Sequence, residues 1–486
     1  MPVHSHSSQC IIVRRRQAAA GLSHMLLAGI IAVFTLIGNR TAQATPLDDY
    51  VAAPDPAFKY DKIDAKEKDD CTTVVYHLVS QTWLDAGKVD RPLWEHTLLV
   101  TVPKDLKFTR AMMFIGGGDN PKQPEKPNAD NGPMERIAVM TKSIVAQVKQ
   151  IPNQPLFFVG DTVEKYKESG RKEDELITFG WDKYLSSGDP LWLARLPMTK
   201  AVVRAMDVTQ KEFPQVDGFF VAGGSKRGWT TWTVAAVDKR VFGIAPAVID
   251  VLNFEASLAN HHNAYGFWAP AIQDYVDMKI VDRIHTPAFR NLLSVVDPYS
   301  YRDRLTMPKF IINAAGDQFF TPDSSKFYFD GLKGEKFLCY VPNVDHGLNA
   351  EAYFLLASFY QMLLSGAPLP KFTWEKAADG ALTLTSESKP VKVLQWKAHN
   401  PDARDFRLAT LGPKYESSPA VESRPGVYTS NVTPAEKGWT AFFLEVEFNN
   451  PGFSAPLRFT TGVSIVPDTY PGASKAASPG PQSDKK

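Results

Sequence analysis

The order of predicted strands and helices is the feature that most limits the folds open to this chain. Apolar and β-branched residues recur with a period of two at 71–82, 93–103 and 109–115, which predicts three early strands. Beyond them, strands alternate with helices. We predict further strands at 155–159, 217–222, 242–249, 309–314 and 336–341, and helices at 134–149, 194–213 and 350–364. Antiparallel strands followed by this alternation are typical of an α/β fold with a mainly parallel sheet covered on both faces.

Two segments depart from that alternation. Residues 253–305 are mostly helical in pattern and rich in aromatic residues, and we expect them to form a cap over the carboxyl edge of the sheet. From 371 to 467, short period-two runs separated by Gly and Pro turns predict a β-sandwich domain. The main α/β domain then spans 45–370. Residues 468–486 are Pro, Ser, Gly and Lys rich and are predicted to be disordered.

The first 44 residues differ in composition from the rest. Three consecutive arginines precede an apolar run at 25–38, and small residues end the segment at Ala44. This order is typical of a secretory signal peptide, so we expect residues 1–44 to be removed from an exported protein, periplasmic or extracellular, that begins at Thr45. An uncleaved membrane anchor is the alternative, because the apolar run is only slightly shorter than a bilayer span. No other stretch approaches that length, and we expect no stable membrane insertion after cleavage.

Removal of this segment changes the charge and the number of cysteines. The mature chain keeps 50 basic and 53 acidic residues and has no basic block, which gives no electrostatic reason to expect nucleic acid as a partner. It also keeps two cysteines, Cys71 and Cys339. In an oxidising compartment these two would be candidates for a disulfide bond. The alternative is that both are buried free thiols.

The stretch "VAGGSKRGWTTW" places Ser225 between a predicted strand and a helix-compatible segment. Small residues around a serine on such a turn are typical of the nucleophile of an α/β-hydrolase, in the pattern Gly-x-Ser-x-Gly. Gly223 fits the first half of that pattern. Arg227 stands where the second glycine is expected, and Gly228 comes one residue late. A structural turn without chemistry is therefore the alternative interpretation.

The order of the polar residues that follow favours the nucleophile. A serine hydroxyl needs a base, and the base needs an acid that fixes its tautomer. The chain has Asp317 after "FIINAAGD" and His346 after "KFLCYVPNVDHG", in the hydrolase order Ser, Asp, His. Asp250, in "IAPAVIDVLNF", is a rival acid, but it leads into the cap, so we favour Asp317. Alternatively, Asp317 and His346 are only turn or helix-start residues.

Other residues are candidates for binding the substrate. We expect the backbone N–H of Lys226, with that of Gly117 or Gly118, to stabilise an oxyanion. Arg227 is a candidate for binding a substrate carboxylate, and Trp268 in the cap is a candidate for contact with the substrate.

No metal or cofactor is expected. The adjacent residues His261 and His262 point to different faces of the chain, and no His, Asp or Glu partner stands at ligand spacing from them.

The strings "GGSKRGWTTW", "GGGDN", "PAVIDVLNF", "NAAGDQFF" and "VDHGLN" strongly resemble the PhoPQ-activated pathogenicity-related proteins, PqaA-like, over about residues 46–470. Their relatives include a secreted proliferation repressor of amoebae. The resemblance implies an exported α/β-hydrolase-like protein associated with bacterial virulence and resistance to antimicrobial peptides. The turn after Gly223 is also similar to the Gly-Cys-Ser-Arg turn of glucuronoyl esterases, with Lys226 in place of the arginine, which implies ester chemistry.

Two functions follow as hypotheses. The first is a serine hydrolase, an esterase or a peptidase, that acts outside the cytoplasm on a substrate with an ester or amide bond, such as a peptide or a saccharide ester. The second is a non-enzymatic secreted interaction or signalling protein that retains the hydrolase fold and uses its β-sandwich as a binding surface, because fold alone does not fix function. The order of Ser225, Asp317 and His346 favours the enzyme.

Overall fold

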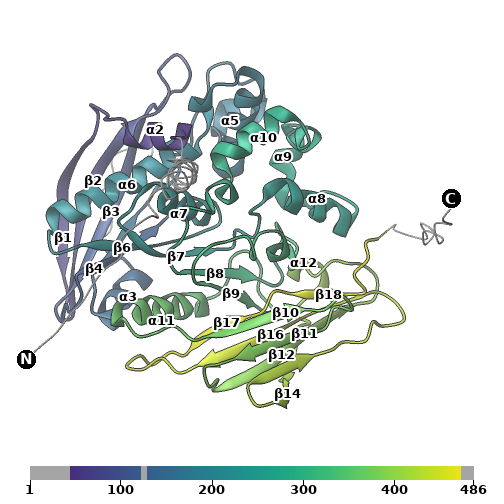
Figure 1. Cartoon of the computed structure of the whole chain (residues 1–486). Coiled ribbons are helices and arrows are strands. Elements are labelled where there is room, and N and C mark those ends of the chain that lie inside the picture. Colours follow the sequence, from purple (N-terminus) through teal and green to yellow (C-terminus); the bar gives the residue numbers. More distant parts are fainter. Residues whose placement is uncertain (1–43, 122–128, 472–486) are drawn as a thin grey trace, which may run out of the picture. The chain divides into compact units, whose positions relative to one another are not determined.

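A 14-stranded mixed sheet is the frame of the computed structural model (Figure 1). The structure describes residues 44–121 and 129–471. The predicted signal peptide lies outside the described residues except for Ala44, and so does the predicted tail beyond Pro471. The first described helix, α2, spans Pro46–Ala52.

One edge of the sheet is antiparallel, as the sequence predicts for 71–82 and 93–103, whereas the third early strand predicted there, 109–115, is parallel to its neighbours. Its strands are β1 (Lys59–Glu67), β2 (Cys71–Thr82) and β3 (Leu93–Pro103), each paired antiparallel with the next. The strands β2 and β3 have the predicted bounds. β1 adds a strand to the prediction, because its residues are mostly exposed and charged and so carry no period-two apolar signal.

The middle of the sheet is parallel. It runs in the order β5, β4, β6, β7, β8 and β9, and each neighbouring pair is parallel. The bounds are β4 Arg110–Ile115, β5 Val145–Val148, β6 Gly218–Gly224, β7 Val241–Ala247, β8 Lys309–Ala314 and β9 Lys336–Val341. The mainly parallel sheet of the prediction is therefore confirmed. The carboxyl ends of these strands meet at one edge, which is where functional groups of such sheets collect.

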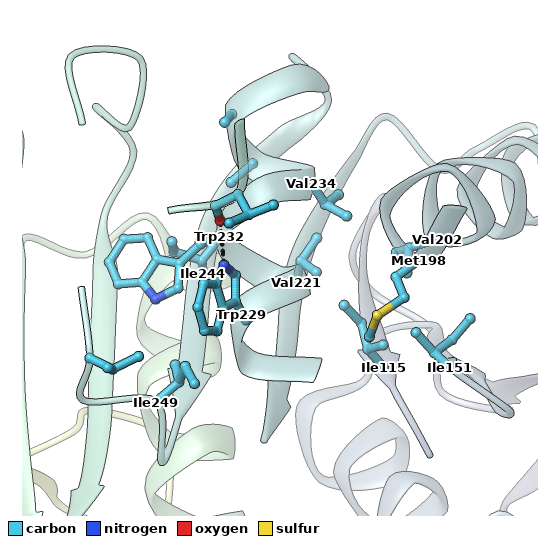
Figure 2. Packing of buried hydrophobic residues seen from close by; sticks show 14 of the residues in the cluster. Ile115, Ile151, Met198, Val202, Val221, Trp229, Trp232, Val234, Ile244 and Ile249 are labelled. Carbon is cyan, nitrogen blue, oxygen red and sulfur yellow. Dashed lines mark hydrogen bonds between the residues drawn. The ribbon is translucent and has the colours of Figure 1, made fainter. Parts of the chain in front are cut away.

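Helices cover both faces of the parallel strands, because successive side chains of a strand point to opposite faces. Phe219 and Val221 of β6 belong to the apolar cluster that includes side chains of α6 and α7, and Figure 2 shows Val221 among these, together with Met198 and Trp229. Phe220, between them in sequence, belongs to a second cluster that includes side chains of α3 and α11. These helices span Arg195–Glu212 (α6), Lys226–Val237 (α7), Pro133–Thr141 (α3) and Glu351–Ser365 (α11).

The expected cap is helical. Its main helices are α8 (Phe254–Tyr265), α9 (Gln273–Asp277) and α10 (Pro287–Val296), joined by short 3₁₀ turns. α10 begins after Thr286, whose hydroxyl accepts the N–H of Phe289, and a proline occupies its first position. Before the cap, α4 (Glu164–Ser169) and α5 (Glu173–Ser187) follow the loop after β5.

The predicted helix at 134–149 is wrong in its second half. α3 ends at Thr141, because Lys142 adopts a left-handed backbone conformation with φ 55°. The β-rich run after it forms β5, which inserts between β3 and β4. The strand predicted at 155–159 is also wrong, since this segment makes only isolated bridges, Leu156 to Arg171 and Phe158 to Val89.

The C-terminal strands are antiparallel, as predicted, and form two layers around shared apolar side chains. One layer contains β10 (Phe372–Lys376), β11 (Leu382–Ser386), β14 (Val421–Arg424) and β15 (Val427–Ser430). The other contains β12 (Lys392–Asn400), β13 (Glu416–Pro419), β16 (Trp439–Phe448), β17 (Leu457–Thr460) and β18 (Ser464–Val466). A short helix, α12, spans Leu408–Leu411.

The second layer is not a separate sheet. β17 pairs with β9 at Thr460 and Leu338, so these strands continue the main sheet. The ring of Phe459 lies 4.5 Å from that of Phe337 and 5.4 Å from that of Phe310, centroid to centroid. Side chains of β17 therefore share one apolar cluster with side chains of β8 and β9. The described residues from Pro46 onward belong to one compact unit. The division near residue 370 into an α/β domain and a β-sandwich domain stays a prediction.

The disulfide considered for the two cysteines is wrong. Cys71 in β2 and Cys339 in β9 are both buried and both free. Six strands lie between β2 and β9 in the sheet. Seven spacings of about 4.8 Å separate the two strands by roughly 34 Å along the sheet, far beyond the separation of about 4.4–6.8 Å that a disulfide requires between Cα atoms.

We expect Phe459→Ala to lower the free energy of unfolding of the whole chain by about 3–5 kcal/mol, because it empties an aromatic site shared by the main sheet and the C-terminal strands. Urea denaturation followed by fluorescence measures the change. Val421→Ala, at a side chain that is 66% exposed on β14, is the control and leaves the unfolding curve unchanged. A separate first transition confined to the C-terminal strands would contradict the single compact unit.

Candidate active site

Ser225 occupies the turn between β6 and α7. Its backbone has φ 59° and ψ −126°, a conformation that costs a residue with a side chain about 1–3 kcal/mol. The surrounding backbone holds it there: the Ser225 N–H donates to the carbonyl of Ala247 at 2.8 Å, and the Ser225 carbonyl accepts the N–H of Trp229 at 2.9 Å. This strained strand-to-helix turn presents the hydroxyl at the carboxyl edge of the sheet, as in an α/β-hydrolase.

Two glycines make the tight turn possible. A Cβ atom on Gly223 would lie 2.9 Å from the backbone of Arg227. A Cβ atom on Gly228 would lie 2.7 Å from the carbonyl oxygen of Ala247, at the end of β7. Gly228 thus permits the close contact between helix and strand that the last glycine of the Gly-x-Ser-x-Gly pattern provides. The departure from the pattern seen in the sequence is a displacement of that glycine by one residue.

His346 links Ser225 to Asp317. The Nε2 atom of His346 lies 2.7 Å from the Ser225 Oγ, and its Nδ1 atom lies 2.9 Å and 3.1 Å from the two carboxylate oxygens of Asp317. Because a carboxylate only accepts, Nδ1 donates and Nε2 is free to accept the serine proton. The structure therefore brings together the three residues that the sequence suggested, one from the end of β6, one after β8 and one after β9.

Neighbouring groups hold this arrangement in place. The Asp317 carboxylate also accepts the backbone N–H of Phe319 at 2.7 Å. The backbone N–H of His346 donates to the side-chain carbonyl of Gln318 at 3.1 Å. The ring of Phe319 lies 4.4 Å from the imidazole. The His346 side chain is 14% exposed and that of Asp317 is 3% exposed. The acid is thus shielded from water, while the base and the nucleophile border open space.

Asp250, the rival acid, binds other partners. Its two carboxyl oxygens accept the hydroxyls of Tyr328 and Tyr340, each at 2.6 Å. Burial raises the pKa of Asp250 to about 7, although the two tyrosines oppose that rise. This side chain ties the end of β7 to β9 and to the loop between β8 and β9. Asp317, and not Asp250, is therefore the acid in contact with the imidazole of His346.

The donors expected for an oxyanion lie on both sides of Ser225. Lys226 is the first residue of α7, and the first N–H groups of a helix have no partner within it. Gly117 follows β4, the strand beside β6, and borders the same cleft as Ser225. Gly118, the other candidate, does not line that cleft.

The two cations after the nucleophile are paired with acids that the sequence analysis missed. The Lys226 Nζ lies 2.7 Å from Asp174, and the Arg227 Nη1 lies 2.6 Å from Glu173. Both acids stand in the first turn of α5. Their position in the sequence gives no indication that they lie near Ser225. The only signal in the sequence is a run of acidic residues at the start of a helix. Arg227, the candidate for a substrate carboxylate, is therefore already engaged with a protein carboxylate.

Trp268 does not reach the reacting groups. Its ring lies 4.6 Å from that of His262 and 5.9 Å from that of His261, within the cap, and it lines neither cavity beside Ser225. His261 has both ring nitrogens occupied: Nδ1 lies 3.1 Å from the Phe319 carbonyl, and Nε2 accepts the N–H of Ala269 at 3.0 Å. Burial lowers the pKa of His261 to about 4, so it is neutral at neutral pH.

Two hollows open on either side of Ser225 and His346. One is a small cavity of about 50 Å³ beneath the cap. The other is a cleft of about 460 Å³ between the strand ends and α11. Small residues at the carboxyl ends of β6 and β7 make room for the cleft, namely Ala222, Gly223, Gly224, Ala245 and Ala247. A substrate whose scissile bond lies at Ser225 can therefore place one of its two groups in the cavity and the other in the cleft.

Within residues 44–121 and 129–471, no cluster of three or more His, Cys, Asp or Glu side chains has the arrangement of a metal site. In the same residues, no helix has both the length and the apolar character needed to cross a membrane.

Comparisons with known proteins give the following. A family model described as PhoPQ-activated pathogenicity-related protein matches residues 47–407. The Autocrine proliferation repressor protein A of Dictyostelium discoideum is 37% identical over 461 residues, covering 88% of this chain and 92% of that protein. Among solved structures, an acetyl xylan esterase from Paenibacillus sp. R4 is 12% identical, covers 67% of this chain and 96% of its own, and has a TM-score of 0.47. A glucuronoyl esterase from Solibacter usitatus is 16% identical, covers 56% of this chain and 72% of its own, and has a TM-score of 0.33.

We expect Asp317→Asn to reduce the turnover of p-nitrophenyl acetate by roughly 10⁴-fold without unfolding the protein, because the amide favours the wrong imidazole tautomer. Asp250→Asn is the matched control, an identical change at a buried aspartate that follows the neighbouring strand β7, and should keep turnover within about tenfold of the wild type. Steady-state kinetics and circular dichroism of both variants make the comparison. The reverse result, a silent Asp317→Asn and an inactive Asp250→Asn, would assign the acid to Asp250.

Proposed function

This chain belongs to the family of PhoPQ-activated pathogenicity-related proteins, and we propose that it is a serine hydrolase that cleaves an ester or amide bond through an acyl-enzyme. One observation carries the proposal: an unbroken hydrogen-bond chain from the Ser225 hydroxyl through His346 to Asp317. A structural serine needs neither a base at its hydroxyl nor an acid behind that base. A nucleophilic serine needs both.

In the first half of the reaction, the Ser225 Oγ attacks the carbonyl carbon of the substrate and its proton passes to Nε2 of His346. The Asp317 carboxylate stabilises the imidazolium that forms. The N–H groups of Lys226 and Gly117 are the proposed donors to the oxyanion. As the tetrahedral intermediate collapses, the bond to the leaving group breaks and the leaving group takes the proton from Nε2. The acyl group remains on Ser225 as an ester.

In the second half, water replaces the leaving group. Nε2 of His346 accepts a proton from the water as its oxygen attacks the acyl carbon, and the same proton returns to the Ser225 Oγ when the ester bond breaks. The carboxylic acid product and the free enzyme result. All proton transfers use one imidazole, that of His346, whose Nε2 lies 2.7 Å from the Ser225 Oγ.

The cleft of about 460 Å³ supports a sizeable, polar substrate group such as a peptide or a saccharide. Its wall combines the polar side chains of Gln147 and Asn349 with the rings of Phe114 and Tyr353. Hydroxyl-rich rings bind where an aromatic face and hydrogen-bonding groups converge, and peptides can use the same groups.

Export is the second part of the proposal. The described fold begins with α2 at Pro46, and Leu47 is fully buried. Cleavage after Ala44 would therefore leave almost no chain ahead of the first packed helix. We place the mature protein in the periplasm or outside the cell, where a role in virulence or in resistance to antimicrobial peptides would be exercised.

A second candidate function rests on the amoebal relative. That protein is named a proliferation repressor, and it is 37% identical over most of both chains. In this alternative the chain is a secreted interaction or signalling protein, and Ser225 has no chemical role. Reactivity of Ser225 separates the two functions.

We expect a fluorophosphonate to label the folded wild-type chain, because an activated serine attacks phosphorus as it attacks a carbonyl carbon. Ser225→Ala should abolish the labelling, and Ser186→Ala, the same change at an exposed serine of α5, should leave it intact. In-gel fluorescence and peptide mapping give the readout. A folded wild-type chain that does not react, or a Ser225→Ala variant that still does, would support the non-enzymatic alternative.

We expect the protein recovered from the periplasm or the medium of a bacterial host to begin near Thr45. N-terminal sequencing of the purified chain measures this. A chain that stays in the membrane fraction with its first residues intact would identify an anchor in place of a signal peptide.

A further inference from the structure

We infer that the cavity beneath the cap is the acyl pocket and that it restricts the substrate to esters of short apolar acids with about two to four carbons. This inference rests on the proposed hydrolase function and adds a substrate class to it. It starts from the position of the cavity, which reaches both Ser225 and His346.

The walls of the cavity come from separate parts of the fold. Its lining is mostly apolar and includes Val251, Phe254, Leu258, Tyr275 and Phe319. Among them, Phe254 and Leu258 lie on α8, Tyr275 lies on α9, and Phe319 follows Asp317. The cap therefore closes over the cavity, and Phe254, Leu258 and Tyr275 are each less than 10% exposed.

The polar side chains of the wall already have partners within the protein. Asp174 accepts from Lys226 at 2.7 Å and from Tyr275 at 3.1 Å. Both ring nitrogens of His261 and both carboxyl oxygens of Asp250 are occupied, as described above. Thr321 and Ser324 bond to each other at 2.9 Å. A polar substituent entering this cavity would lose its water and find these groups engaged, whereas an alkyl chain loses nothing.

The volume limits the length of that chain. The cavity measures about 50 Å³. A cavity of about 150 Å³ holds benzene, which has six carbons. The space beside Ser225 is thus sufficient for about one to three carbons beyond the carbonyl. Longer chains would have to push apart packed rings, which a close-packed interior resists.

The cavity and the cleft differ in how open they are to solvent, and this difference indicates which part of the substrate each one binds. The leaving group must depart while the acyl group stays on Ser225, and water must then enter. The cleft beside α11 is open enough for both, since Tyr353 on its rim is 38% exposed. The cavity beneath the cap has no such exposed rim among its apolar residues. The acyl group therefore occupies the cavity and the alcohol occupies the cleft.

The test measures kcat/KM for p-nitrophenyl acetate, butyrate, hexanoate and octanoate, per site titrated with fluorophosphonate. We expect the wild type to prefer acetate or butyrate over octanoate by roughly tenfold or more. Leu258→Ala enlarges the cavity and should raise the ratio of octanoate to acetate by about tenfold. Leu292→Ala, the same change at a fully buried leucine of α10 that does not line the cavity, is the matched control and should leave that ratio unchanged.

Val251→Ala enlarges the same cavity by less and replaces Leu258→Ala if that variant does not fold. It should raise the ratio of kcat/KM for hexanoate to that for acetate. Leu292→Ala should leave that ratio unchanged. A second series keeps the acyl group as acetate and lengthens the alcohol. A wild type that accepts octanoate as well as acetate, or a rate that depends steeply on the alcohol and not on the acid, would overturn the inference while labelling of Ser225 persists. Loss of all hydrolysis together with loss of labelling would overturn the proposed function as well.

Discussion

The contact between the Ser225 turn and the end of β7 is the constraint on which the rest of the site depends. The Ser225 N–H donates to the Ala247 carbonyl, and Gly228 lets α7 approach the same oxygen. Together they keep a serine at positive φ, which its side chain disfavours. The strands β8 and β9 then follow β7 in the sheet, so the loops after them bring Asp317 and His346 to the same edge. The Ser225 turn and the order of strands in the sheet together assemble the site.

The C-terminal strands take part in this arrangement. Arg404, whose side chain is 1% exposed, lies 2.7 Å from the buried carboxylate of Asp323. Burial raises the pKa of Asp323, but the charges of Arg404 and Lys326 outweigh it and hold that pKa well below its usual range. Asp323 belongs to the loop that begins at Asp317 and forms part of the cavity wall. Breaking a buried pair of this kind costs about 3–5 kcal/mol, so the C-terminal region stabilises the loop that carries the acid. Tyr470, which the sequence placed in a disordered tail, bonds to Asn260 at 2.7 Å beside the same loop.

Much of the parallel sheet follows from the sequence because its strands are buried on both faces. β8 and β9 are short apolar runs that end at Gly or Pro turns, and the predicted bounds of both agree with the structure. Ser225, Asp317 and His346 were suggested by their order along the chain. The strands that the sequence analysis missed carry no local signal. β5 is a run of only four residues after a helix, and β1 is charged and exposed. The partners of Lys226 and Arg227 could not be found, since α5 lies some fifty residues earlier and only the folded chain brings it to α7.

The central claim is that His346 activates Ser225, and the rate of covalent reaction tests it most directly. The second-order rate constant for fluorophosphonate labelling of Ser225 can be compared between the wild type and His346→Ala, because labelling needs the nucleophile but no turnover. The account predicts that the variant remains folded and that labelling slows by roughly 10²- to 10⁴-fold. Labelling of Ser225 at the wild-type rate in His346→Ala would contradict it.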